Sequence, residues 1–157
     1  MKGKSLVWGL LLVLAVAAFA SAASTDGDGS AEPLVRVQEG EGALAGFPEH
    51  DTFIADATEP QVKVLFSTER GVRDFKVLAL TLENVDKDGK ITFSVKELYA
   101  LDKLTPERPL MVGLTFFGTI PHYGIAYADE NGVTRSFAVD ESGEDGSLYL
   151  WEIETIP

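Results

Sequence analysis

VRDFKVLALTLENVDKDGKITFSV, residues 72 to 95, carries the clearest structural signal in the chain. Its first part, Val72 to Val85, is a long extended run that is apolar on both faces around Val77 to Leu82, as is typical of a central strand. Residues 91 to 95 then alternate between apolar and polar side chains, which indicates a strand with one buried face. The glycine that ends Asp86-Lys87-Asp88-Gly89 accepts the positive φ of a tight turn, so we predict a β-hairpin here.

The same strand rhythm continues on both sides of this hairpin, with further turn sequences at Asp129 to Gly132 and Gly143 to Gly146. Alternating apolar side chains mark the other predicted strands, and they include Val62, Val64, Phe66, Leu110, Val112, Leu114, Phe116, Tyr123, Ile125, Tyr127, Val133, Phe137, Val139, Tyr149, Trp151 and Ile153. Short strands separated by tight turns predict an all-β fold, an antiparallel β-sandwich of about seven or eight strands. In strand rhythm alone it resembles the immunoglobulin and fibronectin type III sandwiches, a resemblance that implies no function.

One segment also fits a helix. Residues 94 to 97, SVKE, match a capping box, and Leu98 and Leu101 follow Val95 at helical spacing. A short helix near residues 95–103 is therefore the alternative to a strand there.

The start of the chain has the layout of a secretory signal peptide. Lys2 and Lys4 precede an apolar run from Leu6 to Ala20, and Ala20-Ser21-Ala22 supplies the small residues that a signal peptidase accepts. The apolar run is about 15 residues, short of the ~20 that cross a bilayer as a helix. We therefore expect a signal peptide over residues 1–22 and a secreted or periplasmic protein with no stable membrane anchor after cleavage.

The remaining chain divides into a leader and one domain. Residues 23–33 hold no large apolar side chain in their main part, Ser24 to Pro33, which predicts a flexible leader. Residues 34–157 are long enough for a single β domain with its own core.

The composition of the chain limits the classes of partner it can bind and the kinds of site it can form. The chain has 13 Lys and Arg against 25 Asp and Glu, a net charge of −12, so we expect no nucleic-acid partner. It has no cysteine, which excludes disulfides, thiol nucleophiles and thiolate zinc sites and favours a bacterial exported protein. The sequence contains no G-x-S-x-G or H-E-x-x-H motif.

The turn after Val85 also resembles part of a calcium loop of the EF-hand kind. Asn84, Asp86 and Asp88 place oxygen ligands at alternate positions before a glycine. The twelfth position, which needs a bidentate glutamate, is Val95 instead. A hairpin turn without an ion explains the same residues, and a calcium-binding loop is the alternative to it.

A second candidate site follows from the alternating direction of the strands. The turn at residues 86–89 and the loops at 118–123 and 140–146 are expected at one end of the sheet, where crowded carboxylates attract a cation or a ligand. A hydrophilic loop end without a site is the alternative. The candidate ligand-binding residues are Asp86, Asp88, His122, Tyr123, Glu144 and Asp145, with Asp140 and Glu141 nearby.

Three functions remain open from the sequence. The first is a non-catalytic interaction domain that binds a protein or a glycan through a sheet face or this loop end, with rings such as Phe117 and Trp151 either in the core or exposed for stacking. The second is a small exported enzyme with an acidic or metal site, in which His50 and His122 could be ligands. The third is a calcium-stabilised structural domain.

Overall fold

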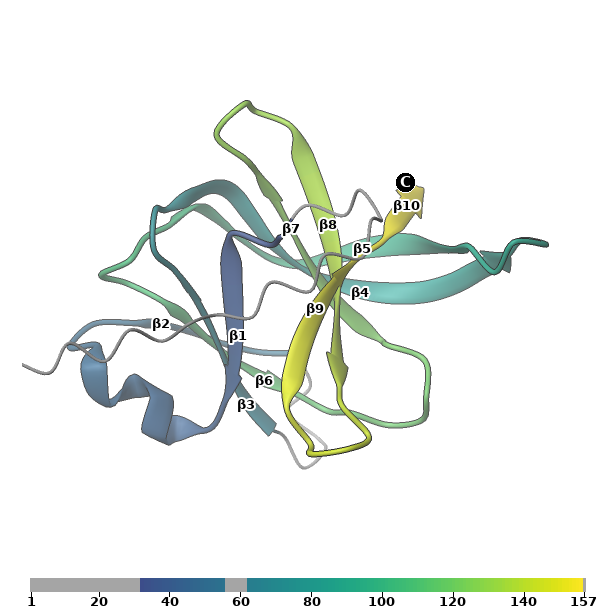
Figure 1. Ribbon diagram of the computed structural model, residues 1–157. Helices are drawn as coiled ribbons and strands as arrows, with labels where there is room; N and C mark the ends of the chain where they lie inside the picture. The colour runs from purple at the N-terminus through teal and green to yellow at the C-terminus, as the bar shows by residue number, and fades with distance from the viewer. Residues whose placement is uncertain (1–31, 56–61, 157) are drawn as a thin grey trace, which may run out of the picture.

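The computed structural model describes residues 32–55 and 62–156. Over these ranges the chain is all-β, with two sheets packed together as in a sandwich (Figure 1). The expected signal peptide and nearly all of the expected leader lie outside the described residues. Within the described residues, no helix is long and apolar enough to span a membrane.

The smaller sheet has four strands in the order β1-β3-β6-β2. Neighbouring strands in this sheet are antiparallel, except that β2 runs parallel to β6. The bounds are β1 Val35–Glu39, β2 Asp51–Ile54, β3 Val62–Thr68 and β6 Leu110–Leu114, and a 3-10 helix, η1, spans Glu41–Gly46.

The larger sheet has six strands in the order β10-β5-β4-β7-β8-β9, with β4 near its centre as its apolar faces predicted. The long β4–β5 hairpin projects from the body of the molecule (Figure 1). The bounds are β4 Val72–Val85, β5 Ile91–Leu104, β7 Tyr123–Ala128, β8 Thr134–Glu141, β9 Leu148–Glu152 and β10 Glu154–Ile156.

The last segment of the chain closes this larger sheet on itself. β9 pairs with β8 at one edge, and β10 pairs in parallel with β5 at the other edge. Between them only Ile153 intervenes; it is buried, and its N–H donates to the Ser136 carbonyl at 2.9 Å. We call the closed part of the sheet, formed by the turn-proximal half of the β4–β5 hairpin with β7, β8, β9 and β10, the small barrel.

Two cores result from this arrangement. The main core lies between the sheets and contains buried side chains such as Phe66, Phe75 and Tyr127. The second core fills the small barrel with Leu78, Leu80, Phe93, Ala126, Ala138 and Ile153, and the half-buried Trp151 packs edge-on against Phe93. The apolar side chains expected on both faces of β4 are confirmed, since β4 contributes to both cores.

The helix expected near residues 95–103 was wrong, because β5 is one continuous strand through this segment. β4 pairs with it along its length, and a bulge leaves Leu98 without an opposite residue between Val77↔Tyr99 and Leu78↔Glu97. An extra residue in a strand breaks the two-residue alternation, so the apolar spacing imitates that of a helix. Glu97, the expected capping residue, instead forms an ion pair with Lys76 at 2.6 Å.

Candidate binding cavity at the mouth of the small barrel

Three connections meet at one end of the small barrel. They are the β4–β5 hairpin, the long loop between β6 and β7, and the β8–β9 hairpin. Two adjoining cavities lie among them, and they share Thr119, Ile120, Pro121 and Asp140. We call the two cavities together the barrel mouth.

The first cavity, of about 430 Å³, is mostly apolar. Strand alternation explains its lining, since every second side chain of β4, β5, β8 and β9 points into the small barrel. The cavity is therefore the open end of the second core, with Phe93 at its base. Its lining residues are Leu82, Val85, Ile91, Phe93, Thr119, Ile120, Pro121, Asp140, Tyr149 and Trp151.

Several apolar side chains at this cavity remain in contact with solvent. Val85 is 52% exposed, Ile120 45% and Tyr149 42%, and each belongs to a different connection or strand. Because the three segments are far apart in sequence, no single motif marks the cavity. The sequence signals this cavity only through exposed aliphatic residues at a turn and in a Pro-containing loop. We missed these residues in the sequence because we looked for clusters of acids.

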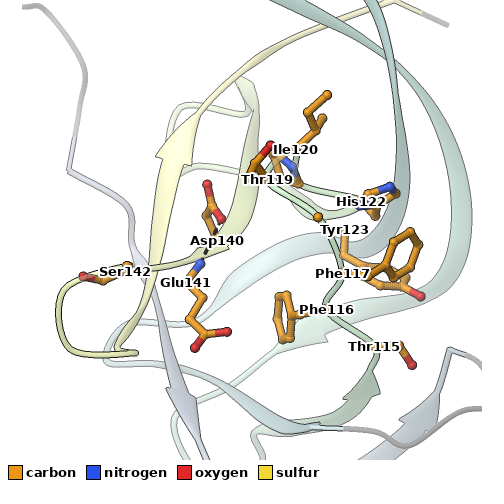
Figure 2. Close-up of a pocket in the computed structure, with 13 residues that line it drawn as sticks. Thr115, Phe116, Phe117, Thr119, Ile120, His122, Tyr123, Asp140, Glu141 and Ser142 are labelled. Atoms are coloured by element: carbon orange, nitrogen blue, oxygen red, sulfur yellow. Dashed lines mark hydrogen bonds between the residues drawn. The ribbon is translucent and has the colours of Figure 1, made fainter.

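The second cavity, of about 470 Å³, is lined by residues 115–123 and 140–143 and is more polar (Figure 2). Figure 2 shows Asp140 and Glu141 on one side and Phe117 and His122 on the other. The His122 and Phe117 rings lie 4.0 Å apart between centroids. The backbone of this loop is anchored, because the Leu80 N–H donates to the His122 carbonyl at 2.8 Å.

Asp140 stands at the junction of the two cavities. One carboxylate oxygen accepts from the Glu141 N–H at 2.9 Å, and the other accepts from the Tyr149 hydroxyl at 3.3 Å. Burial and the Asp140 carboxylate raise the pKa of Tyr149, so this phenol stays protonated. Among the described residues that line the barrel mouth, none is Lys or Arg.

The structure brings together some of the residues proposed from the sequence. His122 and Tyr123 line the second cavity, together with Asp140 and Glu141. Glu144 and Asp145 lie in the β8–β9 turn, outside the cavity lining. Asp145 accepts from the Ser147 hydroxyl at 2.7 Å and from its N–H at 3.0 Å, and these bonds lower the pKa of Asp145.

Asp86 and Asp88 are exposed at the tip of the β4–β5 hairpin, also outside the lining. One Asp86 carboxylate oxygen accepts from the N–H groups of Asp88 and Lys90, at 2.9 and 2.8 Å. This bonding stabilises the turn and accounts for Asp86 without an ion, and the positive φ of Gly89, 81°, accounts for the glycine. Calcium at Asn84, Asp86 and Asp88 stays a prediction.

The two histidines belong to different cavities. His50 lies at a cavity of the smaller sheet, beside Glu41 and Lys63, whereas His122 lies at the barrel mouth. In the described part of the chain, no group of three or more His, Asp or Glu side chains is placed to hold a metal ion.

The barrel mouth therefore offers an apolar cavity, a carboxylate at its edge and a partly exposed aromatic ring beyond it. Such a lining suits the burial of an apolar group and the attraction of a positive charge. Comparison with protein-family models, curated proteins and solved structures finds no match to this chain.

Proposed function

We propose that this chain is a secreted or periplasmic, non-catalytic binding domain that takes a protein or glycan ligand at the barrel mouth. The signal-peptide layout of residues 1–22 supports the export part of this proposal. The rest depends on the chemistry of the mouth.

The observation that carries the proposal is the gathering of exposed apolar side chains from separate segments at one cavity. Single exposed hydrophobic residues are ordinary, but a contiguous apolar patch around a cavity is typical of a binding site. Val85, Ile120 and Tyr149 form such a patch above the second core. Covering them removes apolar surface from water, at about 25 cal/mol per Å².

The mouth is also held in shape before any ligand binds. The Leu80–His122 backbone bond fixes the β6–β7 loop against β4. In the β8–β9 hairpin, the Ser142 N–H donates to the Ser147 carbonyl and the Gly146 N–H donates to the Ser142 carbonyl, at 2.8 and 2.9 Å. A preformed surface loses less conformational entropy on binding, which favours affinity.

A matched pair of variants tests the proposal. Ile120→Asp puts a charge into the mouth. Val133→Asp puts the same charge on another exposed aliphatic residue, 53% exposed against 45% for Ile120, at the far end of the larger sheet. Ligands are first found by screening the purified protein against a glycan array and a displayed library of random peptides. We expect Ile120→Asp to weaken their binding more than about tenfold and Val133→Asp to leave it unchanged. Ligands that bind both variants as well as the parent would refute the proposal.

A further inference from the structure

We infer that the ligand of the barrel mouth is an extended polypeptide segment that inserts an apolar side chain beside a Lys or Arg. This inference rests on the proposed function and names the partner class of the same site.

The polarity of the first cavity favours an apolar side chain over a sugar. A sugar ring needs several polar partners for its hydroxyl groups, and a buried polar group without a partner is costly. The polar side-chain atoms among the lining residues are those of Thr119, Asp140, Tyr149 and Trp151, and Asp140 and Tyr149 already bond to each other. Trp151 is half-buried and packs against Phe93 at an interplanar angle of 63°, so part of its surface is already covered.

The charge of the mouth favours a cation next to that apolar side chain. Asp140 lies where the two cavities join, and Glu141 follows it along the second cavity. The Tyr149 hydroxyl donates to Asp140 at the long distance of 3.3 Å, and a carboxylate oxygen accepts more than one donor. With no Lys or Arg among the described lining residues, the partner is the source of the complementary charge.

The position of the two cavities beside the same loop residues favours an extended chain. The two cavities share Ile120, Pro121 and Asp140, so a ligand crossing this loop occupies both. In an extended peptide, side chains two residues apart lie on the same face, about 7 Å from each other. One can fill the apolar cavity while a neighbouring cation reaches Asp140 or the exposed ring of Phe117.

The test starts from selection of random twelve-residue peptides displayed on phage, with the purified parent protein as bait. We expect the selected peptides to share a large aliphatic or aromatic residue with Lys or Arg within two positions. The best peptide is then synthesised with a fluorophore, and its Kd is measured by fluorescence anisotropy. Ile120→Asp and Val85→Asp alter the mouth from two separate segments, so the test does not depend on one variant.

Charge is tested with Asp140→Asn, which keeps the side-chain shape, and with Glu107→Gln as a control at an exposed turn away from the mouth. We expect Asp140→Asn to weaken peptide binding about five- to tenfold at low salt and Glu107→Gln to change it little. Raising the ionic strength to about 0.5 M should weaken binding to the parent and reduce the difference between the parent and Asp140→Asn.

The outcomes separate this inference from the proposed function. Failure to enrich any peptide, selected peptides without a basic residue, or equal Kd values for the parent and Asp140→Asn overturn the partner class. Glycan ligands that are lost in Ile120→Asp, with no peptide ligand, also overturn it while the mouth remains the binding site. A peptide that binds Ile120→Asp and Val85→Asp as tightly as the parent refutes both proposals.

Discussion

Asp86 and Asp129 begin turns of similar hydrogen bonding but have different surroundings. Asp86 and Asp129 each accept two backbone N–H bonds within a five-residue turn. Asp129 also accepts from Arg135 at 3.3 Å, and its side chain is only 11% exposed. Arg135 in turn donates to Glu152 at 2.9 Å, which links this turn to β9.

We therefore predict that Asp129→Ala destabilises the protein more than Asp86→Ala does. The first substitution removes a turn cap and leaves Arg135 without one of its carboxylate partners, whereas the second removes only an exposed cap. Thermal unfolding by calorimetry checks the order of the two midpoints. A lower midpoint for Asp86→Ala would contradict it.

The same residue makes stability depend on pH. Bonds from the Val133 and Asn131 N–H groups and from Arg135 lower the pKa of Asp129 below its ordinary value of 3.8. A carboxylate with a lowered folded-state pKa stabilises the protein above its unfolded-state pKa, and this contribution is lost as the pH falls through the folded-state pKa. Urea unfolding should show a gap between the parent and Asp129→Ala that is full near neutral pH and narrows as the pH falls below the ordinary pKa of 3.8. A gap that is constant over this range would contradict the prediction.

Tyr127 connects the start of the domain to the main core. Its ring is fully buried and stacked on Phe137, and its hydroxyl accepts from the Leu34 N–H at 2.9 Å. Tyr127→Phe keeps the ring and removes this bond, so we expect a loss of about 1 kcal/mol in the free energy of unfolding. Denaturant titration measures it, and an unchanged midpoint would show that the bond contributes nothing.

Among the secondary-structure elements, strands were predicted well where apolar and polar side chains alternate without a bulge. The β4–β5 hairpin and its Asp-Gly turn were evident from residues 72 to 95. The helix prediction failed because a bulge at Leu98 depends on how β4 and β5 pair, and pairing is not visible in one strand alone. The short parallel strands β2 and β10 were missed for the same reason, since each is defined by a distant partner.

A close approach of backbone at Gly124 gives a prediction for β7. A Cβ on Gly124 would lie 2.6 Å from the Phe137 carbonyl oxygen and 3.2 Å from the Leu80 methyl groups. Gly124→Ala must therefore displace paired backbone, and we expect it to destabilise the protein by about 1–3 kcal/mol. Gly143→Ala is the control, because a Cβ there meets nothing within 4 Å. Equal unfolding midpoints for the two variants would show that β7 and β8 separate easily.

At the scale of the whole molecule, the C-terminal segment connects both edges of the larger sheet. The alternating direction of its other strands places three connections at one end, as we expected from the sequence. Which side chains meet there was less predictable, because it depends on the bulges and on the closure by Ile153. Asp86 and Asp145, which we singled out in the sequence, accept bonds within their own turns, whereas aliphatic residues such as Val85 and Ile120 line the mouth.

Because the larger sheet closes through Ile153, we expect a substitution of this residue to lower the free energy of unfolding strongly. Ile153 is buried in the second core between β9 and β10. We expect Ile153→Ala to cost about 2–5 kcal/mol and to loosen the barrel mouth. Hydrogen exchange of the β5 and β10 amides checks this, and unchanged protection of those amides would show that the sheet stays closed without this side chain.

The central claim is that the barrel mouth is the binding surface. Its most direct test is the Kd of one selected ligand for the parent, Ile120→Asp and Val133→Asp, each first shown to be folded by circular dichroism. We expect a loss of affinity of more than about tenfold for Ile120→Asp and no change for Val133→Asp. Equal affinities for the two variants would contradict it.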